Sequence, residues 1–490
     1  MNPLEFSSNM SSSLSWGNIC CAALLAVFDA TKVSFPGSAP YDSSISSYWS
    51  SQAATPQPVC VFTPSCTHDV AKALHALTAA EPWSQGKDVC RFAVKSGGHA
   101  SYAGAANIMD GVTVDMSSMN SIELSQDRSI VSVGVGARWQ QVYDKLDPFN
   151  LTAVGGRNGL VGVGGLTTGG GVSHFSPRAG WSCDTVSNYE VVLADGSIVN
   201  TREDSELLSS LRGGSNNFGI VTKVDLKTLE QGPLWGGQIY NSISTVDTVL
   251  KTLASLNSAD DYDEYASLIT AFGFSQGMVA IANDIAYTKD QANPPIFKPL
   301  TELPSFLNSM RITNVSDIAA EMATFQPVGL RELYSAITVV SSLEMINATY
   351  MSFNKTVENV QDIPGIVWSV VLEPLPRQIY QRAPKGTNAL GLSDRTQPLL
   401  IVLVSATWQD EEYDDKINQQ AQSLIQDIQE QAHRLNAYDP FIYLNYAAPW
   451  QDPIASYGKA NVQKLQKVKT RVDPTGVFTR NVPGGFKVPK

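Results

Sequence analysis

The chain has 490 residues, of which 43% are hydrophobic, and its formal net charge is -12. This length allows two domains around separate cores, and the hydrophobic share is ordinary for a globular protein. The negative charge argues against nucleic acids and anionic membranes as partners, and no apolar stretch approaches the ~20 residues that span a bilayer.

The N-terminal region is rich in serine and then has a helical pattern around residues 20–30. The first residues lack the basic and apolar regions of a signal peptide, so we do not expect an intact one. The apolar run over 19–28 contains two cysteines and is far too short for a membrane anchor, which indicates a buried helix. Sequons that permit glycosylation occur at Asn9, Asn150, Asn314, Asn347 and Asn354.

From 59 to 224, short β-patterns alternate with one clear helix, predicted over 67–79. The apolar run 92–94 is typical of a buried strand and stops at the Ser-Gly-Gly of 96–98. Two glycines let backbone N–H groups converge on an anion such as a phosphate ester. His99 follows at once, so a nucleophilic nitrogen would lie beside the ligand of this loop. The segment predicts a tethered cofactor that carries phosphate.

A second glycine-rich stretch has nine glycines in the seventeen residues 155–171. We expect neither helix nor regular sheet there, but a backbone packed against a flat ligand. A third glycine turn, at 213–214, leads into a β-rich run. No Gly-x-Gly-x-x-Gly opens a helix in a βαβ unit and no P-loop motif is present, which argues against those two nucleotide sites.

Residues 230–435 have fewer glycines and longer helical patterns, such as the one over 414–435. We expect strands over 264–272, 278–287, 365–372 and 398–407. This mixture predicts an α+β module in which helices cover a sheet.

The motifs resemble those of the FAD-linked oxidases of the vanillyl-alcohol oxidase superfamily. They are Lys95-Ser-Gly-Gly-His99, Val161-Gly-Val-Gly-Gly165, Gly169-Gly-Gly171, Val191-Val-Leu-Ala-Asp-Gly196 and Gly213-Gly-Ser-Asn-Asn-Phe-Gly-Ile-Val221. The C-terminal segments 443–446, 451–453, 456–458 and 473–478 resemble the same group. The resemblance covers roughly residues 20–490 and is closest to the berberine-bridge-enzyme-like branch, in its fungal type.

The resemblance implies an α+β, two-domain fold of the PCMH-type FAD-binding class. An α+β substrate domain, an antiparallel sheet covered by helices, would be inserted into the FAD-binding domain. We place the N-terminal part of the FAD-binding domain at 1–228, the substrate domain at 229–438 and the C-terminal return at 439–490. We expect no metal, because the six cysteines show no metal-ligand spacing.

The resemblance also implies FAD, bonded to His99 through the flavin 8α-methyl carbon. Many relatives add a second bond through a cysteine three residues before the Val161 motif. Asn158 has that place here and Cys183 is too far along the chain to substitute, so we expect a single covalent link. We assign cofactor contacts to His99 and to Lys95, Ser96, Gly97, Gly98, Ala100, Val161, Gly162, Gly164, Gly165, Thr168, Gly169, Gly170, Gly171, Phe218, Gly219, Ile220, Val221 and Asn445.

Oxidation of an alcohol needs a base for the hydroxyl proton. In the family a Tyr-x-Asn strand lies over the flavin, and alternation places Tyr443 and Asn445 on one face of it and Tyr446 on the other. We predict Tyr443 as the base, its pKa lowered by a cation or by the flavin, and Asn445 as its positioning partner. The alternative is that both tyrosines are packing aromatics.

Three further residues remain open. Glu373 lies at a strand end where some relatives place a carboxylate base, and the alternative is an exposed glutamate. His174 either faces the flavin ring or substrate or is a hydrogen-bonded structural histidine. Tyr102 is a candidate wall of the pocket.

The implied reaction is hydride transfer from an alcohol of a secondary-metabolite intermediate to flavin N5. O2 then reoxidises the flavin and H2O2 is released, which the small side chain of Val161 beside the flavin favours. One alternative is a secreted oligosaccharide oxidase that forms a lactone, for which we expect extended aromatic groove residues and an acidic pair near the ring. Another is a relative that binds a small molecule without redox turnover.

Secreted members of the family tie the N-terminal segment to the residue just before the flavin-linking strand. The resemblance therefore implies a disulfide between Cys90 and either Cys20 or Cys21, and a location in the secretory pathway.

Overall fold

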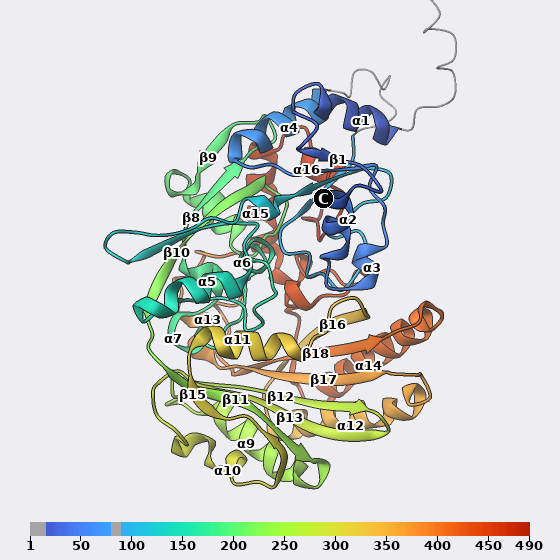
Figure 1. Cartoon of the computed structure of the whole chain (residues 1–490). Coiled ribbons are helices and arrows are strands. Elements are labelled where there is room, and N and C mark those ends of the chain that lie inside the picture. The colour runs from blue at the N-terminus through green and yellow to red at the C-terminus, as the bar shows by residue number, and fades with distance from the viewer. Residues whose placement is uncertain (1–15, 80–89) are drawn as a thin grey trace, which may run out of the picture.

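The computed structural model describes residues 16–79 and 90–490. The sequon Asn9 and the first residues, which we assessed for a signal peptide, lie outside the described residues. The chain forms two packed units, with the N-terminal and C-terminal segments together in the upper half of Figure 1 and a large sheet in the lower half. Each unit has its own cluster of buried apolar residues.

Two sheets build the upper unit. The first has the order β1-β2-β4-β3, and β4 pairs in parallel with both β2 and β3. The second has the order β5-β6-β10-β8-β9, with β7 beside β10. The strands are β1 (Val33–Ser34), β2 (Cys60–Phe62), β3 (Phe92–Lys95), β4 (Val112–Asp115), β5 (Ile122–Leu124), β6 (Ile130–Gly134), β7 (Leu151–Ala153), β8 (Val186–Val192), β9 (Ile198–Asn200) and β10 (Ile220–Glu230).

Short helices connect these strands, and the C-terminal segment adds two more. They are α1 (Trp16–Leu25), α2 (Ala39–Ser46), α3 (Ser51–Ala54), α4 (Thr67–Ala79), α5 (Trp139–Leu146), α6 (Val163–Thr168), α7 (Ser176–Ala179), α8 (Ser205–Leu211), α15 (Lys459–Val472) and α16 (Val477–Arg480). Because α15 packs on α8, the end of the chain completes the unit that the beginning of the chain starts.

A nine-stranded sheet, all of whose pairings are antiparallel, builds the lower unit. Its order is β14-β11-β13-β12-β17-β18-β16-β19, with β15 beside β11. The strands are β11 (Leu234–Ser242), β12 (Ala266–Ser275), β13 (Met278–Tyr287), β14 (Ser305–Asn308), β15 (Arg311–Thr313), β16 (Arg331–Val340), β17 (Val367–Leu375), β18 (Leu399–Trp408) and β19 (Tyr438–Asp439).

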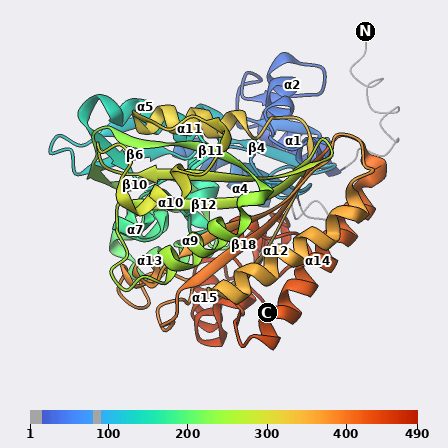
Figure 2. The ribbon, with the colours of Figure 1, turned by 90° about the horizontal axis from the view of Figure 1, so that it is seen from below.

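Helices cover the outer face of this sheet, and Figure 2, seen from below, shows α9, α12 and α14 crossing it. The inner face looks toward the upper unit, where α11 packs against α5. The helices of this unit are α9 (Val246–Ser258), α10 (Lys298–Thr301), α11 (Val315–Thr324), α12 (Leu343–Val360), α13 (Arg377–Gln381) and α14 (Asp414–Arg434). The α+β class and the antiparallel sheet covered by helices are confirmed.

Alternation along β17 sets the two faces of the sheet. Trp368, Val370 and Leu372 are buried beneath the helices, in the cluster of the lower unit. Glu373 takes the other parity, and Ile401, its partner on β18, belongs to the cluster of the upper unit. Glu373 therefore faces the junction of the two units, as strand alternation predicts.

The predicted helix over 67–79 and strand over 278–287 are confirmed as α4 and β13. Two predictions about backbone are wrong. The glycine-rich stretch contains the helix α6, because Val163, Leu166 and two threonines supply a helical turn whose glycines allow close packing on Ser96. The segment at Tyr443 is not a strand: residues Leu444–Tyr446 form a single 3₁₀ turn.

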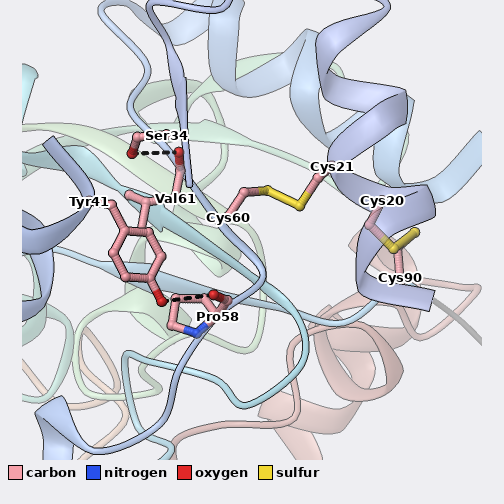
Figure 3. The surroundings of a disulfide bond; sticks show 8 residues. All are labelled: Cys20, Cys21, Ser34, Tyr41, Pro58, Cys60, Val61 and Cys90. Atoms are coloured by element: carbon pink, nitrogen blue, oxygen red, sulfur yellow. Dashed lines mark hydrogen bonds between the residues drawn. A yellow bond between two sulfur atoms is a disulfide. The ribbon is translucent and has the colours of Figure 1, made fainter. Parts of the chain in front are cut away.

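Two disulfides fasten α1 to the first sheet (Figure 3). Cys20 bonds to Cys90, just before β3, which confirms the implied pairing and selects Cys20. Cys21 bonds to Cys60 at the start of β2. Cys60 begins β2 and Cys90 lies just before β3, and these two strands flank β4, so α1 is held over the edge of the sheet that carries the His99 loop.

None of the helices within the described ranges is long and apolar enough to cross a membrane. The sequon residues Asn150, Asn314, Asn347 and Asn354 are all exposed.

Candidate active site

The loop after β3 is held from below by Lys95. Its ammonium is buried and donates to the Ser44 carbonyl (2.6 Å), the Ser47 hydroxyl (2.6 Å) and the Asp115 carboxylate (3.1 Å). These three acceptors engage the ammonium, so the side chain of Lys95 fixes α2 beneath the loop. The backbone of the loop, and not this side chain, is left to contact an anion.

The loop after β3 and the second glycine-rich stretch, 155–171, touch each other. A Cβ added to Gly97 would lie 2.5 Å from the Gly162 backbone, so side chains are excluded there. The Ser96 hydroxyl donates to the Val135 carbonyl (2.5 Å) and accepts from the Gly164 amide (3.2 Å). The two loops therefore form one surface of bare backbone.

The Arg138 guanidinium joins the same loops from the side. It donates to the carbonyls of Gly97 (3.1 Å) and Leu160 (3.0 Å), and also to that of Ser47 (3.1 Å). This cation was not foreseen from the sequence, because its three acceptors are distant in the chain.

His99 stacks on Trp49, with ring centroids 4.4 Å apart and an angle of 7° between the planes. Its Nδ1 is buried and has no hydrogen-bond partner within residues 16–79 and 90–490. Burial, and next the charge of Arg138, lower the pKa of His99 to about 3, so the imidazole is neutral and keeps a free electron pair. A buried nitrogen without a partner is costly, and a covalent bond to a cofactor would remove that cost.

The other assigned cofactor residues have mostly structural contacts. The Ala100 carbonyl accepts from Ser50, the Val161 carbonyl from Trp139, and the Thr168 carbonyl from Gly213 and Ser215. Phe218 is buried, Gly219 packs on Val191, and Ile220 and Val221 pair with β8. Gly165 is open, with nothing near the place of a Cβ.

Asn158, at the place where many relatives have the second covalent link, is buried and is hydrogen-bonded to other residues of the protein. Its amide donates to Gln326 (2.7 Å) and its carbonyl oxygen accepts from the Leu160 amide (2.8 Å). Cys183 is buried too, and burial raises the pKa of its thiol well above the usual value. Neither residue offers a second reactive thiolate.

Tyr443 lies against the triple glycine. Its oxygen accepts hydrogen bonds from the amides of Gly171 and Val172, both 3.1 Å, and from the Asn445 side chain at 3.1 Å. Asn445 also donates to the Leu166 carbonyl (3.2 Å). Burial raises the pKa of Tyr443 to about 12, although the charge of Arg157 acts to lower it. That the flavin lowers this pKa stays a prediction.

Glu373 is at the centre of a buried ionic cluster. Arg157 donates to both of its carboxylate oxygens (2.9 and 3.0 Å), and the Tyr446 hydroxyl donates to one of them (2.7 Å). Arg157 also contacts the Tyr446 oxygen at 2.7 Å. Glu373 is only 3% exposed, so the alternative of an exposed glutamate is wrong. Alternation failed for Tyr446 because a 3₁₀ turn, unlike a strand, does not separate neighbouring side chains onto opposite faces.

Charge and burial act in opposite directions on the pKa values of the groups in this cluster. Burial lowers the pKa of Arg157, but Glu373, Tyr446 and Asp284 together outweigh burial and raise that pKa above the usual value. Burial raises the pKa of Tyr446 well above its usual value, against the opposing effect of Arg157. The phenol is therefore neutral, and its proton lies next to a carboxylate that can accept it.

A chain of rings connects this cluster to His99. Trp49, which stacks on His99, lies 5.3 Å from Tyr334; Tyr334 lies 5.7 Å from Tyr446; and Tyr446 lies 4.8 Å from Tyr443, all between ring centroids. Residues from both units thus border one site, at the inner face of the nine-stranded sheet.

His174 and Tyr102 fall on opposite sides of the site. His174 Nδ1 lies 3.2 Å from the Ser267 hydroxyl, and its ring is buried at the junction of the units. Tyr102 packs on Phe486 and lines a cavity of about 270 Å³ that also includes Arg331, Glu332 and Tyr334.

Models of known families match two segments of the chain that contribute to this site. A family model described as an FAD binding domain matches residues 58–202, and one described as berberine and berberine like matches 442–482. The FAD-dependent monooxygenase tpcD of Cochliobolus heterostrophus is 34% identical over 471 residues, covering 93% of this chain and 89% of that protein. The chain belongs to the berberine-bridge-enzyme-like family of FAD-dependent oxidoreductases.

Two further similarities complete the comparison. Oligopeptidase PhomG' of Diaporthe leptostromiformis is 39% identical over 477 residues, but 95% of this chain covers only 37% of that longer protein. The solved structure of 6-hydroxy-D-nicotine oxidase from Arthrobacter nicotinovorans matches with a TM-score of 0.76 at 20% identity, over 92% of this chain and 96% of that one. This likeness confirms the two-domain fold of the PCMH-type FAD-binding class.

Proposed function

We propose that the protein is an oxidase that holds FAD through a single covalent bond to His99 Nδ1 and oxidises an alcohol. The observation that carries this proposal is the buried Tyr446–Glu373–Arg157 cluster, joined by a chain of rings to an imidazole with an unpartnered nitrogen. Bound FAD supplies an acceptor for a hydride from the substrate carbon.

The chain's own residues handle the proton. As the substrate C–H bond gives up its electron pair, the hydroxyl proton passes to the Tyr446 oxygen and the phenol proton passes to Glu373. Arg157 keeps the Tyr446 oxygen and the Glu373 carboxylate in place by hydrogen bonds of 2.7–3.0 Å. Glu373 therefore ends the step protonated, and the substrate carbon and oxygen form a carbonyl group. Tyr443, whose ring lies 4.8 Å from that of Tyr446, and Asn445 shape the wall beside this pair.

The inner face of the sheet offers a floor of small side chains for the substrate. One row of paired residues is Tyr240, Ala282, Ala271, Val371, Leu403 and Ala336. The next row is Ser242, Ala280, Gly273, Ser369, Ser405 and Tyr334. Most of these residues are partly exposed while their strand neighbours are buried, so the floor is open and mostly apolar or small. A flat, largely apolar substrate fits such a floor.

Gly273 supports this interpretation. A Cβ there would meet only Ser369, at 3.7 Å, which is an ordinary contact, and its φ needs no glycine. Glycine weakens a strand interior, so its presence where the fold does not require it favours close approach of a ligand.

The oligosaccharide alternative has one feature in its favour. Asp284 and Glu373 form an acidic pair near the site, and Tyr240, Phe306 and Phe325 form an aromatic group at its edge. However, both acids are at most 5% exposed, and Arg157 already engages Glu373. We therefore favour an alcohol on an aromatic secondary metabolite, the substrate class for which the floor is suited.

Anaerobic bleaching of the flavin tests the proposal. The purified holoenzyme is mixed without O2 with polycyclic benzylic alcohols, with oligosaccharides, and with no donor. We expect the aromatic alcohols to bleach the flavin and the sugars to leave it oxidised. Bleaching by the sugars alone would establish the oligosaccharide oxidase instead, and no bleaching by any donor would favour the binder without redox turnover.

The name of the relative tpcD specifies a monooxygenase, in which oxygen from O2 enters the product. Turnover with isotopically labelled O2 separates the two reactions. An oxidase places the label in H2O2 alone, and a monooxygenase places it in the organic product.

We also propose that the protein passes through the secretory pathway. The two disulfides and the four exposed sequons support this, because disulfides persist in oxidising compartments.

A further inference from the structure

A second pair of buried polar groups crosses the junction of the two units behind Glu373. His174, from the loop after the triple glycine, has its Nε2 3.7 Å from the Asp284 carboxylate on β13. Both side chains are 5% exposed. Neither His174 Nε2 nor either oxygen of Asp284 has a hydrogen-bond partner among the described residues. The 3.7 Å between Nε2 and one Asp284 oxygen is longer than a direct hydrogen bond, and buried polar atoms of this kind are satisfied in proteins by an ordered water or a shared proton.

The surroundings couple this pair to the catalytic cluster. The charges that act on Asp284 come from Arg157, from Glu373 on β17 and from Glu321 on α11. The neutral Gln238 of β11 also faces Asp284, while its amide donates to Met322 Sδ (2.9 Å). Tyr240, two residues along β11, is in turn influenced by Asp284. On the other side Arg157 acts on His174, whose Nδ1 lies against Ser267 of β12. Arg157 therefore links the Glu373 cluster to the His174–Asp284 pair.

The charge states are suited to holding one proton. Burial raises the pKa of Asp284 to about 7, with Arg157 opposing, so this carboxylate can accept or release a proton near neutral pH. Burial, and next Arg157, lower the pKa of His174 to about 3, so the imidazole remains a neutral neighbour. A neutral imidazole can donate to the Asp284 carboxylate from Nε2 while Nδ1 accepts from Ser267.

The stoichiometry of an oxidase gives such a pair a possible use. An alcohol loses a hydride and a proton, and both hydrogens end in H2O2 when O2 takes up the electrons. The proton leaves the substrate first, and O2 reacts later. Between the two half-reactions the proton must be stored in the protein or exchanged with solvent.

We propose that the His174–Asp284 pair stores the hydroxyl proton between the two half-reactions. This rests on the proposed oxidase function. Tyr446 and Glu373 collect the proton, it moves on to the Asp284 carboxylate, and it returns when O2 is reduced. His174 and Asp284 are positioning residues, since neither touches the substrate.

Proton release during a single anaerobic turnover tests the proposal. The holoenzyme, in weak buffer at pH 8 with a pH-indicator dye, is reduced by one equivalent of an alcohol that bleaches it. At pH 8 the Asp284 carboxylate is ionised and can accept the proton. Because the pair is buried, we expect the wild type to release the proton only after the flavin has bleached, and Asp284→Asn to release about one proton per flavin as it bleaches. The same time course of release in the two proteins would overturn the proposal, whereas absence of bleaching would mean that the oxidase assignment itself had failed.

The matched control is Glu332→Gln, which alters another buried carboxylate, 3% exposed, on the same face of the sheet. We expect this variant to release the proton only after bleaching, as the wild type does. Flavin content and the circular dichroism spectrum establish that each variant is folded.

A second measurement needs no substrate. In protein with isotope-labelled histidine, His174→Asn identifies the ring-nitrogen signals of His174 among the five histidines. We expect these signals to shift between pH 6 and 8 as Asp284 ionises, and to be insensitive to pH in Asp284→Asn. Signals that titrate identically with and without the carboxylate would contradict a shared proton.

Discussion

Tyr446 and Tyr443 lie side by side but have different partners. Tyr446 donates to Glu373 within an ionic cluster, whereas the oxygen of Tyr443 accepts two backbone amides. We expect Tyr446→Phe and Glu373→Gln to slow flavin reduction by ~10²–10⁴-fold, the usual contribution of a positioned base. Stopped-flow absorbance of the flavin measures this rate. Full-rate reduction in Tyr446→Phe would remove this residue from the proton path.

Tyr443→Phe has a different expected effect. The variant leaves the Gly171 and Val172 amides without their buried acceptor, so the free energy of unfolding should fall by about 1–3 kcal/mol. Chemical denaturation measures the loss. If the variant kept its stability but lost turnover, Tyr443 would be the base, as the sequence alone suggested.

Single residues also show what sequence can and cannot predict. The resemblance placed Glu373, Tyr443 and Asn445 in the site, because each belongs to a recognisable local motif. Arg157 was not foreseen, since its partners Glu373 and Tyr446 are 216 and 289 residues away in sequence. In the sequence, Arg157 is a cation within a run of glycines, and this pattern does not indicate which residues it contacts.

Secondary-structure elements are predictable where apolar residues recur regularly along the sequence. The strand β13 and the helix α4 appear as expected, because their apolar residues recur at the period of each structure. The short elements α6 and the 3₁₀ turn at 444–446 were mispredicted, since close packing with distant loops decides their conformation. Sequence reasoning is weakest for such short pieces, and the site is built from them.

The floor of the sheet gives a prediction for β12. Gly273→Phe should place a ring in the open space and raise the KM for an aromatic alcohol by ~10-fold or more, with stability retained. Gly273→Ala is the control, because its methyl group would make only an ordinary contact with Ser369. Steady-state peroxide release measures KM. Unchanged KM in Gly273→Phe would show that the substrate lies elsewhere.

The anchoring of α1 can be tested through its second disulfide. Replacing Cys21 and Cys60 together by serine should lower the free energy of unfolding by about 2–4 kcal/mol, since the bond closes a loop of 39 residues in the unfolded chain. Cys66→Ser, at an exposed free cysteine, should change little. Denaturation curves compare the variants, and equal curves would show that α1 does not depend on the bond.

For the whole molecule, buried acids set part of the response to pH. Burial raises the pKa of Glu332 to about 8 from 4.5, so the folded state holds a proton that the unfolded state has lost. The folded state binds more protons in that window, and its stability falls as pH rises toward 8. Glu332→Gln should therefore gain stability relative to the wild type between pH 5 and 9, measured as the difference in Tm. A difference that does not change with pH would contradict a buried, protonated Glu332.

The two-unit architecture was predictable because the glycine content changes between the two regions and the family motifs return at the C-terminus. The junction between the units was not, since it brings together residues such as His174 and Asp284 that no local pattern connects. We retain 1–228, 229–438 and 439–490 as the proposed division. The site lies where these segments meet.

The attachment of the cofactor is the claim on which the rest depends, and peptide mass spectrometry tests it most directly. Purified protein is precipitated with acid, digested and searched for the peptide that contains His99. We predict that this peptide carries the mass of a flavin, that His99→Ala yields none, and that the exposed His75→Ala is labelled as the wild type is. A colourless protein whose His99 peptide stays unmodified after FAD is supplied would contradict the account.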